Sequence, residues 1–181
     1  DLGLPDIGLT TLMEVAGRPM LQLQIERLAP VADQYRVVVA TSDLPIDDAV
    51  EALARANDCD VVRGPEQDVL TRFGLVLDRY VPTHLVRLTG DCPLTDPEIV
   101  VDVIDLHLSS GAAYTSNVHP RSFPHGLDVE AATAEALGTA VREASDPSDR
   151  EHVMPFLVAR PERFPAANLD SGSDLGGLRW T

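Results

Sequence analysis

Apolar runs and amphipathic stretches alternate along most of the chain. Short β-branched or apolar runs bounded by turn residues are typical of buried strands, and helical spacing of apolar residues predicts amphipathic helices. The predicted strands cover residues 35–40, 60–63, 84–89, 112–116, 127–132, 164–169 and 178–181. The predicted helices cover residues 19–28, 43–57, 67–80, 98–109, 133–144 and 149–159.

Two of these helices have features that can be checked in a structure. In the helix over residues 98–109, Val101, Ile104 and Leu108 are expected to share one side. The last helix is predicted to begin after Ser148, because Ser148 and Glu151 have the spacing of a capping box.

The alternation of strands and helices predicts an α/β protein, a three-layer α/β/α sandwich with a mainly parallel sheet. No repeat or linker divides the chain, so residues 1–181 are expected to form one domain. The chain starts in a Gly/Pro-punctuated loop and stops inside a strand-like segment. We therefore expect that a first strand and a C-terminal helix of the complete domain are missing.

Composition narrows the classes of function. The net charge of −15 makes nucleic acid an improbable partner, because the overall field repels phosphates. No apolar run approaches the length of a membrane span and no signal peptide is evident, so no membrane partner is expected. Cys59 and Cys92 fit neither a disulfide framework nor a zinc site, which favours a reducing cytoplasm.

The most informative segment follows the predicted strand over residues 84–89. Gly90 and Asp91 stand at the carboxyl end of that strand, where open α/β sheets bind ligands. A carboxylate there is suited to hold Mg²⁺ against a nucleotide phosphate. The alternative is that Asp91 only shapes the turn.

Several ordered segments together resemble the cytidylyltransferase family of the spore coat polysaccharide biosynthesis type, relatives of the synthetases that make CMP-activated acidic sugars. The segments are residues 17–21, 40–43, 63–64 with 68–70, 87–94, 116–117, 123–124 with 126–130, 146–153 and 178–181. The resemblance implies a nucleotide-diphospho-sugar transferase fold, CTP as donor, a sugar acceptor, Mg²⁺ as cofactor and pyrophosphate as product. It also implies that Asp91 is the catalytic metal ligand.

The amino-terminal loop departs from the family pattern. The family has a triphosphate-binding loop rich in glycine and arginine that ends in lysine. Here Gly3 is retained as a nucleotide-binding candidate, but Asp1 and Asp6 stand in place of arginines and Thr10 in place of the lysine. Because nucleotidyl transfer depends on neutralising the phosphates, each lost charge contact is expected to cost roughly 10²–10³-fold in rate.

The other nucleotide candidates follow two further predicted strands. Arg63, Gly64 and Asp68 form a strand-to-helix turn of the kind that cradles a base, or else a plain helix start with Asp68 in its first turn. Ser42 and Asp43 end a strand in the same predicted crevice, or else cap the next helix.

The acceptor candidates are cationic or lie near a glycine turn. They are Arg121, His125, Asp128, Arg150 and His152. Arginine binds carboxylates and phosphates through a two-pronged contact, which suits an anionic acceptor. Asp128 is also a candidate metal ligand, with an arginine-paired strand-edge carboxylate as the alternative, and His152 could equally be a buried structural histidine. Arg87 is expected to join an internal ion pair, whereas His84 and His107 are predicted to be incidental.

The sequence therefore predicts a cytidylyltransferase that transfers CMP from CTP to an acidic or modified sugar in surface-polysaccharide biosynthesis. A nucleotide-binding pseudoenzyme of the same fold is the second hypothesis, supported by the acidic amino-terminal loop. A nucleotide-sugar glycosyltransferase is less favoured, because the one Asp-x-Asp pair, residues 58–60, precedes a strand. The oligomeric state stays open, a homodimer included.

Overall fold

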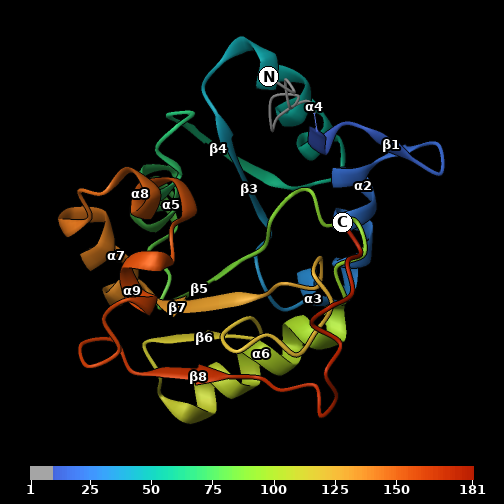
Figure 1. The fold of residues 1–181 in the computed structure, drawn as a ribbon. Helices are drawn as coiled ribbons and strands as arrows, with labels where there is room; N and C mark the ends of the chain where they lie inside the picture. The colour runs from blue at the N-terminus through green and yellow to red at the C-terminus, as the bar shows by residue number, and fades with distance from the viewer. Residues whose placement is uncertain (1–9) are drawn as a thin grey trace, which may run out of the picture.

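The computed structural model of the chain describes residues 10–181 (Figure 1). The predicted amino-terminal loop, with Gly3, lies outside the described residues except for Thr10. The helices are α2 (Met20–Arg27), α3 (Ala29–Ala32), the 3₁₀ turn η1 (Pro45–Asp47), α4 (Asp48–Ala56), α5 (Val69–Tyr80), α6 (Pro97–Ser110), α7 (Ala134–Glu143), α8 (Pro147–His152) and α9 (Pro155–Val158). Among residues 10–181, no helix combines the length and apolar character needed to cross a bilayer.

The strands form a mixed arrangement rather than one parallel sheet. They are β1 (Glu14–Val15), β2 (Arg18–Pro19), β3 (Val38–Ser42), β4 (Asp60–Gly64), β5 (His84–Arg87), β6 (Tyr114–Ser116), β7 (Glu130–Thr133) and β8 (Ala166–Asn168). β1 and β2 form an antiparallel hairpin, and β3 pairs in parallel with β4. The four-stranded sheet has the order β5-β7-β6-β8.

The prediction of a mainly parallel sheet is corrected in the four-stranded sheet. β7 runs antiparallel to both β5 and β6, whereas β6 and β8 are parallel. The segment between β6 and β7 contains no helix. A strand that returns without a crossover helix pairs antiparallel with the strand before it, which explains the direction of β7. The consequence is that β7 starts at the same edge of the sheet where β5 and β6 end.

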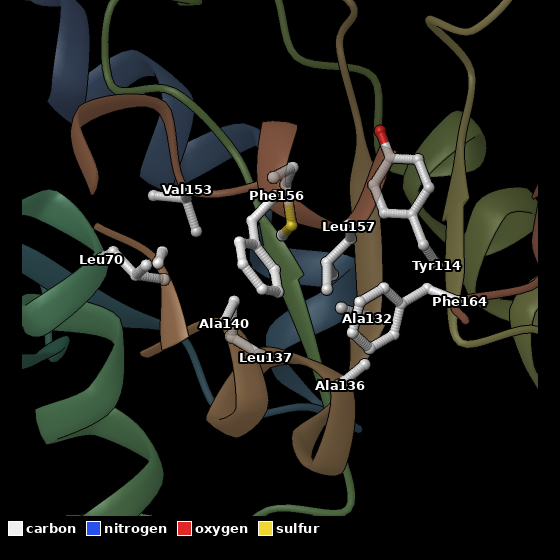
Figure 2. Close-up of a cluster of buried hydrophobic side chains, with 12 residues drawn as sticks. Leu70, Tyr114, Ala132, Ala136, Leu137, Ala140, Val153, Phe156, Leu157 and Phe164 are labelled. Carbon is white, nitrogen blue, oxygen red and sulfur yellow. The ribbon is translucent and has the colours of Figure 1, made fainter. Parts of the chain in front are cut away.

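One hydrophobic cluster joins the helices around β7 (Figure 2). Leu70 of α5, Leu137 of α7 and Leu157 of α9 are each no more than 1% exposed, and Phe156 and Phe164 pack with them. Burying side chains of this size contributes about 1.5–3 kcal/mol each. The cluster therefore fixes α5, α7 and α9 against one face of the sheet.

A second cluster corrects the predicted face of the helix at residues 98–109. In α6 the buried side chains are Val100, Val103, Ile104 and His107. Val101 and Leu108, which were expected on the same side as Ile104, are 37% and 52% exposed. The buried side of α6 therefore contacts Val129 and Ala131 at and beside β7 through a different stripe.

The prediction that His84 and His107 are incidental is wrong. His107 is 2% exposed, its Nε2 lies 3.0 Å from Nδ1 of His84, and its Nδ1 lies 2.9 Å from Oγ1 of Thr115. Burial, and secondly the neighbouring His84, lowers the pKa of His107 below its ordinary value. The pair thus links α6 to β5 and β6.

The predicted helix at residues 149–159 is divided into α8 and α9. Val153 separates them with φ 73° and ψ −58°, a conformation outside the right-handed helix. Pro155, which follows closely, cannot supply the backbone N–H of a continuous helix. The predicted start at Ser148 is also wrong, because Asp146 caps α8 by accepting a hydrogen bond from the Ser148 N–H at 2.8 Å.

Candidate functional site

A cavity of about 470 Å³ opens where β5 and β6 end and β7 begins. The sheet register aligns Arg87, Glu130 and Ser116 in one row across these strands. The polar residues that line the cavity are Arg87, Thr89, His119, Arg121, Asp128, Glu130 and His152. The apolar residues that line it are Val118, Met154, Pro155, Val158 and Ala159. One cavity thus offers both charged and apolar contacts to a small molecule.

Arg87 takes part in an internal ion pair, as predicted. Its Nη1 donates to Oε2 of Glu130 at 2.6 Å, while the Tyr114 hydroxyl donates to Oε1 of Glu130 at 2.7 Å. Burial, and secondly the Glu130 carboxylate, raises the pKa of Tyr114 far above its ordinary value, so the phenol keeps its proton. Both oxygens of Glu130 are therefore engaged at the base of the cavity.

Arg121 and Asp128 form a two-pronged ion pair in the wall of the same cavity. Nη1 and Nη2 of Arg121 donate to Oδ1 and Oδ2 of Asp128 at 2.6 and 2.7 Å. Burial on its own would raise the pKa of Asp128, but the hydrogen bonds and charge of Arg121 outweigh it and lower the pKa. The predicted alternative for Asp128, a carboxylate paired with an arginine, is confirmed, and its role as a metal ligand stays a prediction.

Asp91 lies on the turn after Thr89 and is half-buried, although it is not among the residues that line the cavity. Gln24 of α2 holds this turn on two sides, because its Nε2 donates to the Thr89 carbonyl and to Oγ1 of Thr95, each at 2.9 Å. The predicted position of Gly90 and Asp91 just beyond β5 is confirmed.

The thiol of Cys92 connects the Asp91 turn with the cavity. Burial raises the pKa of Cys92 to about 11, with smaller contributions from the charges of Asp91 and Asp128. Its Sγ lies 3.0 Å from Oγ1 of Thr89, which lines the cavity. The only direct contact of the thiol with Asp91 is long, 3.6 Å from Sγ to Oδ1.

The carboxylates of Asp91 and Asp128 are of the ligand type that suits a hard divalent cation such as Mg²⁺, since such ions prefer carboxylate oxygens. Within residues 10–181, no group of three or more His, Cys, Asp or Glu side chains is arranged to hold a metal ion. Mg²⁺ is commonly bound by one or two carboxylates together with substrate phosphates. The two carboxylates are therefore compatible with a metal that arrives with a nucleotide.

The structure brings three of the acceptor candidates to the cavity or its rim. Arg121, Asp128 and His152 line the cavity, whereas His125 does not, and its backbone N–H donates to the Leu178 carbonyl at 2.9 Å. His152 is exposed, so the alternative of a buried structural histidine is wrong. The contact of these side chains with an acceptor stays a prediction.

Arg150 is engaged between helices instead. Its Nε donates to Oδ2 of Asp68, its Nη1 to the Ala144 carbonyl and its Nη2 to Oγ1 of Thr71, each at 2.8 Å. Asp68 in turn caps α5, accepting a hydrogen bond from the Thr71 N–H at 2.9 Å. Arg150 and Asp68 therefore join α8 to the start of α5, and no contact brings them to the cavity. Their assignment to acceptor and nucleotide stays a prediction.

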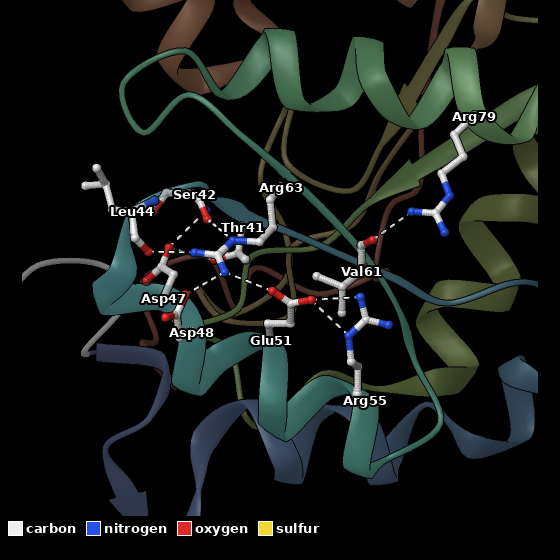
Figure 3. A network of polar contacts seen from close by, with 10 residues as sticks. All are labelled: Thr41, Ser42, Leu44, Asp47, Asp48, Glu51, Arg55, Val61, Arg63 and Arg79. Carbon is white, nitrogen blue, oxygen red and sulfur yellow. Dashed lines mark hydrogen bonds and ion pairs between the residues drawn. The ribbon is translucent and has the colours of Figure 1, made fainter.

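A polar network surrounds the carboxyl ends of β3 and β4 (Figure 3). Arg63 donates through Nε to the Ser42 carbonyl at 2.8 Å and through Nη1 to Asp48 and Glu51 of α4 at 2.6 and 2.8 Å. Ser42 is buried, and its N–H donates to Oδ2 of Asp47 at 2.9 Å. These contacts tie the strand ends to the start of α4.

The two remaining nucleotide candidates differ in exposure. Asp43 is exposed, and its N–H donates to the Gly64 carbonyl at 2.8 Å. Gly64 is buried, and a Cβ at this position would meet side-chain atoms of Leu75 and Arg72 at 2.9 and 3.0 Å. A larger residue here would therefore have to displace side chains of α5.

Sequence reasoning missed Thr89, His119 and Glu130 as cavity residues. The alternation of side chains along a strand places Arg87 and Thr89 on one side of the β5 segment, which was a usable signal. To predict Glu130 as a cavity residue would have required the pairing of β5 with β7, which the sequence alone did not supply. At the other end of the parallel pair, the Asp-x-Asp pair lies at the start of β4, as predicted. Asp58, Cys59 and Asp60 also line a separate cavity there.

Comparisons with known proteins identify relatives of this chain. A family model described as cytidylyltransferase matches residues 11–172. An uncharacterized protein of Methanocaldococcus jannaschii is 31% identical over 172 residues, which are 94% of this chain and 70% of that protein. The spore coat polysaccharide biosynthesis protein SpsF of Bacillus subtilis is 33% identical over 77% of this chain and 57% of its own length. An 8-amino-3,8-dideoxy-manno-octulosonate cytidylyltransferase of Shewanella loihica is 35% identical over 78% and 51%. The chain thus spans between half and about two thirds of these relatives.

Solved structures share the fold. A cytidylyltransferase from Leptospira borgpetersenii matches with a TM-score of 0.91 and 29% identity over 98% of this chain and 76% of that one. CMP:2-keto-3-deoxy-manno-octonic acid synthetase complexed with CTP matches with a TM-score of 0.65 and 15% identity over 89% and 82%. A Mycobacterium tuberculosis protein, Rv0371c, in complex with manganese matches with a TM-score of 0.61 and 18% identity over 94% and 86%. At such low identity the last two show the fold alone.

Proposed function

Because the chain belongs to the cytidylyltransferase family, we propose that it transfers CMP from CTP to an acidic or modified sugar in the biosynthesis of a surface polysaccharide. The observation that carries the proposal is a cavity lined by cationic, acidic and apolar side chains, with Asp91 on the turn that follows its lining residue Thr89. Relatives named for spore coat polysaccharide and for a sugar-acid cytidylyltransferase support the acceptor class.

The proposed reaction needs an acceptor oxygen to attack the α-phosphorus of CTP while pyrophosphate leaves. Asp91 and Asp128 would hold Mg²⁺, which supplies neutralisation of the phosphate charge when bound. His119, Arg121 and His152 would hold the polar side of the acceptor, and Met154 and Val158 its apolar side. No side chain has to form a covalent intermediate, so the task of the chain is to position two substrates.

The metal role of Asp91 is tested by Asp91→Asn in the complete protein. We expect pyrophosphate release from CTP to fall roughly 10²–10³-fold, because one charge contact to the phosphates is lost. The assay would supply Mg²⁺ and a panel that includes 8-amino-3,8-dideoxy-manno-octulosonate and 2-keto-3-deoxy-manno-octonic acid. The matched control is Asp102→Asn, an exposed aspartate of α6, which should leave the rate unchanged. A fully active Asp91→Asn protein would contradict the assignment.

The second candidate function is nucleotide binding without turnover. It is favoured by one sequence observation, the acidic residues Asp1 and Asp6 where the family pattern has arginines. Calorimetry of CTP with Mg²⁺ separates the two. CTP binding together with pyrophosphate release on addition of a sugar acid supports the enzyme, and binding with no release for any acceptor supports the pseudoenzyme. A preference for UDP-sugars over CTP would instead indicate a glycosyltransferase.

A further inference from the structure

The carboxylate of Asp128 is held in a fixed place by its backbone. Asn117 is fully buried, and its side chain bonds on both sides of Asp128. The Asn117 Nδ2 donates to the Leu127 carbonyl at 2.7 Å, and the Val129 N–H donates to the Asn117 Oδ1 at 2.9 Å. Asp128 therefore cannot leave the rim of the cavity without breaking a buried amide network.

The guanidinium of Arg121 is the mobile partner of this pair. The backbone next to it is anchored, because the Leu175 N–H donates to the Ser122 carbonyl and the Ser171 N–H to the Ser122 Oγ, each at 2.9 Å. The long side chain of Arg121 has several rotatable bonds beyond this anchor, and no hydrogen bond of its guanidinium is described other than those to Asp128. A change in this pair therefore requires only a rotation of the Arg121 side chain.

The charges of the cavity make Arg121 the cation that responds to a metal. The lining carries two arginines, Arg87 and Arg121, and two carboxylates, Asp128 and Glu130. Arg87 is paired with the more deeply buried carboxylate, since the side chain of Glu130 is 10% exposed and that of Asp128 is 31% exposed. Asp91 adds a further negative charge on the turn after Thr89, next to Cys92.

We propose that Arg121 and a divalent cation exchange on the Asp128 carboxylate, so that Arg121 sets the metal affinity of the site. The inference rests on the proposed function, in which Asp91 and Asp128 are the metal ligands. The same two oxygens that a cation needs are those that Arg121 occupies. Once released, the guanidinium faces the cavity that it lines, where it is available to the anionic group of an acceptor.

Binding of Mn²⁺ alone to the complete protein tests the exchange, followed through the electron paramagnetic resonance signal of the free ion at fixed ionic strength. We expect Arg121→Gln to bind Mn²⁺ at least about 10-fold more tightly than the unmodified protein, and Asp128→Asn at least about 10-fold more weakly. The double variant Arg121→Gln/Asp128→Asn should bind no more tightly than Asp128→Asn, because the carboxylate for which Arg121 competes is then absent.

Two controls separate exchange from the loss of a positive charge in general. Arg87→Gln removes a charge from the same cavity without touching Asp128, and Arg163→Gln removes an exposed one from an ion pair with Glu143. Both should change the Mn²⁺ affinity by less than about 3-fold. Arg121→Gln binding no more tightly than Arg87→Gln overturns the proposal, as does an unchanged affinity in Asp128→Asn. If either Asp128→Asn or Arg87→Gln fails to fold, Arg121→Gln against Arg163→Gln decides.

The proposed reaction is tested separately on the unmodified protein. Mn²⁺ affinities that follow the expected order, without pyrophosphate release, would refute the transferase function and leave the exchange standing. Pyrophosphate release by the unmodified protein, with an Mn²⁺ affinity that Arg121→Gln does not change, would refute the exchange alone.

Discussion

The chain contains arginine but no lysine, and most of its arginines form ion pairs within the molecule. Arg63, Arg87, Arg121 and Arg150 each bond a carboxylate on another segment. The planar guanidinium can donate to a carboxylate and to backbone carbonyls at the same time, which a lysine ammonium does less well. Arginines that are candidate ligand-binding residues therefore have a structural role as well.

Arg150 provides a direct test of the structural task. Arg150→Gln should lower the free energy of unfolding by about 1–3 kcal/mol, because the partly buried Asp68 carboxylate loses its charged partner. Urea denaturation measures the loss, and Arg163→Gln at an exposed pair should leave the unfolding curve unchanged. A stable Arg150→Gln protein with a raised KM for the acceptor would show instead that Arg150 serves the substrate.

For individual residues, the sequence predicted the partners of some side chains correctly and of others wrongly, and the reason is clear. Arg87 was predicted to be ion-paired because a charged residue inside a strand needs a partner, and Glu130 supplies it. The partnership of Arg150 with Asp68 joins residues 82 positions apart. No local pattern contains such a contact, so a motif alone does not separate a ligand-binding arginine from one that joins two helices.

The contact between His84 and the buried His107 joins elements of the fold and makes stability depend on pH. The pKa of His107 is lowered in the folded state, so the unfolded chain binds more protons as the pH falls below the ordinary histidine value of about 6.5. Folding stability is therefore expected to be lower at pH 5.5 than at pH 8. Urea denaturation at the two values measures the difference, and His107→Gln should reduce it. Equal or greater stability at pH 5.5 in the unmodified protein would refute this prediction.

The helix cap at the start of α8 provides a second prediction about the secondary-structure elements. Asp146→Ala should cost about 1 kcal/mol in unfolding free energy, because the carboxylate that accepts from the Ser148 N–H is lost. Ser148→Ala should change it by less than about 0.5 kcal/mol, since the Ser148 side chain makes no described capping bond at α8. Thermal denaturation ranks the two variants, and the reverse order would restore the capping box expected from the sequence.

Helices and strands were predicted best where one period dominated the local pattern. α5 and β4 lie within two residues of their expected bounds. α6 shows the limit, since apolar residues surround much of its circumference and tertiary contacts select Val100 and Val103 rather than Val101 as the buried stripe. The same limit applies to Asp146, because two adjacent capping patterns competed and only the fold selects one.

For the whole molecule, alternation of helices and strands was enough to predict the α/β class but not the direction of β7. The loop between β6 and β7 sets that direction. The direction of β7 in turn aligns Glu130 with Arg87 at the cavity. The cytidylyltransferase resemblance is confirmed by the family match over residues 11–172. Because many weak segments in the right order cover the chain, family membership was easier to predict than the contacts of individual site residues.

The charge of the whole chain leads to a further prediction. A net charge of −15 opposes compaction through self-repulsion, which salt screens over about 10 Å at 0.1 M. Raising NaCl from 10 mM to 300 mM should therefore increase the melting temperature by about 2 °C or more, corresponding to about 0.5–1 kcal/mol for a domain of this size. Differential scanning calorimetry measures the shift, and a melting temperature that falls with salt would show that attractive ion pairs dominate.

Trp180, the one tryptophan of the chain, lies beside the segment that leads to Asp128. The backbone N–H of Trp180 donates to the His125 carbonyl at 2.8 Å. A Cβ on Gly126, the neighbour of His125, would meet the Trp180 carbonyl oxygen at 2.8 Å. Trp180 is 45% exposed, so its emission is sensitive to the local solvent environment. The molecule thus carries an intrinsic fluorophore next to Gly126, two residues before Asp128, and changes around Asp128 can be followed optically in the unlabelled protein.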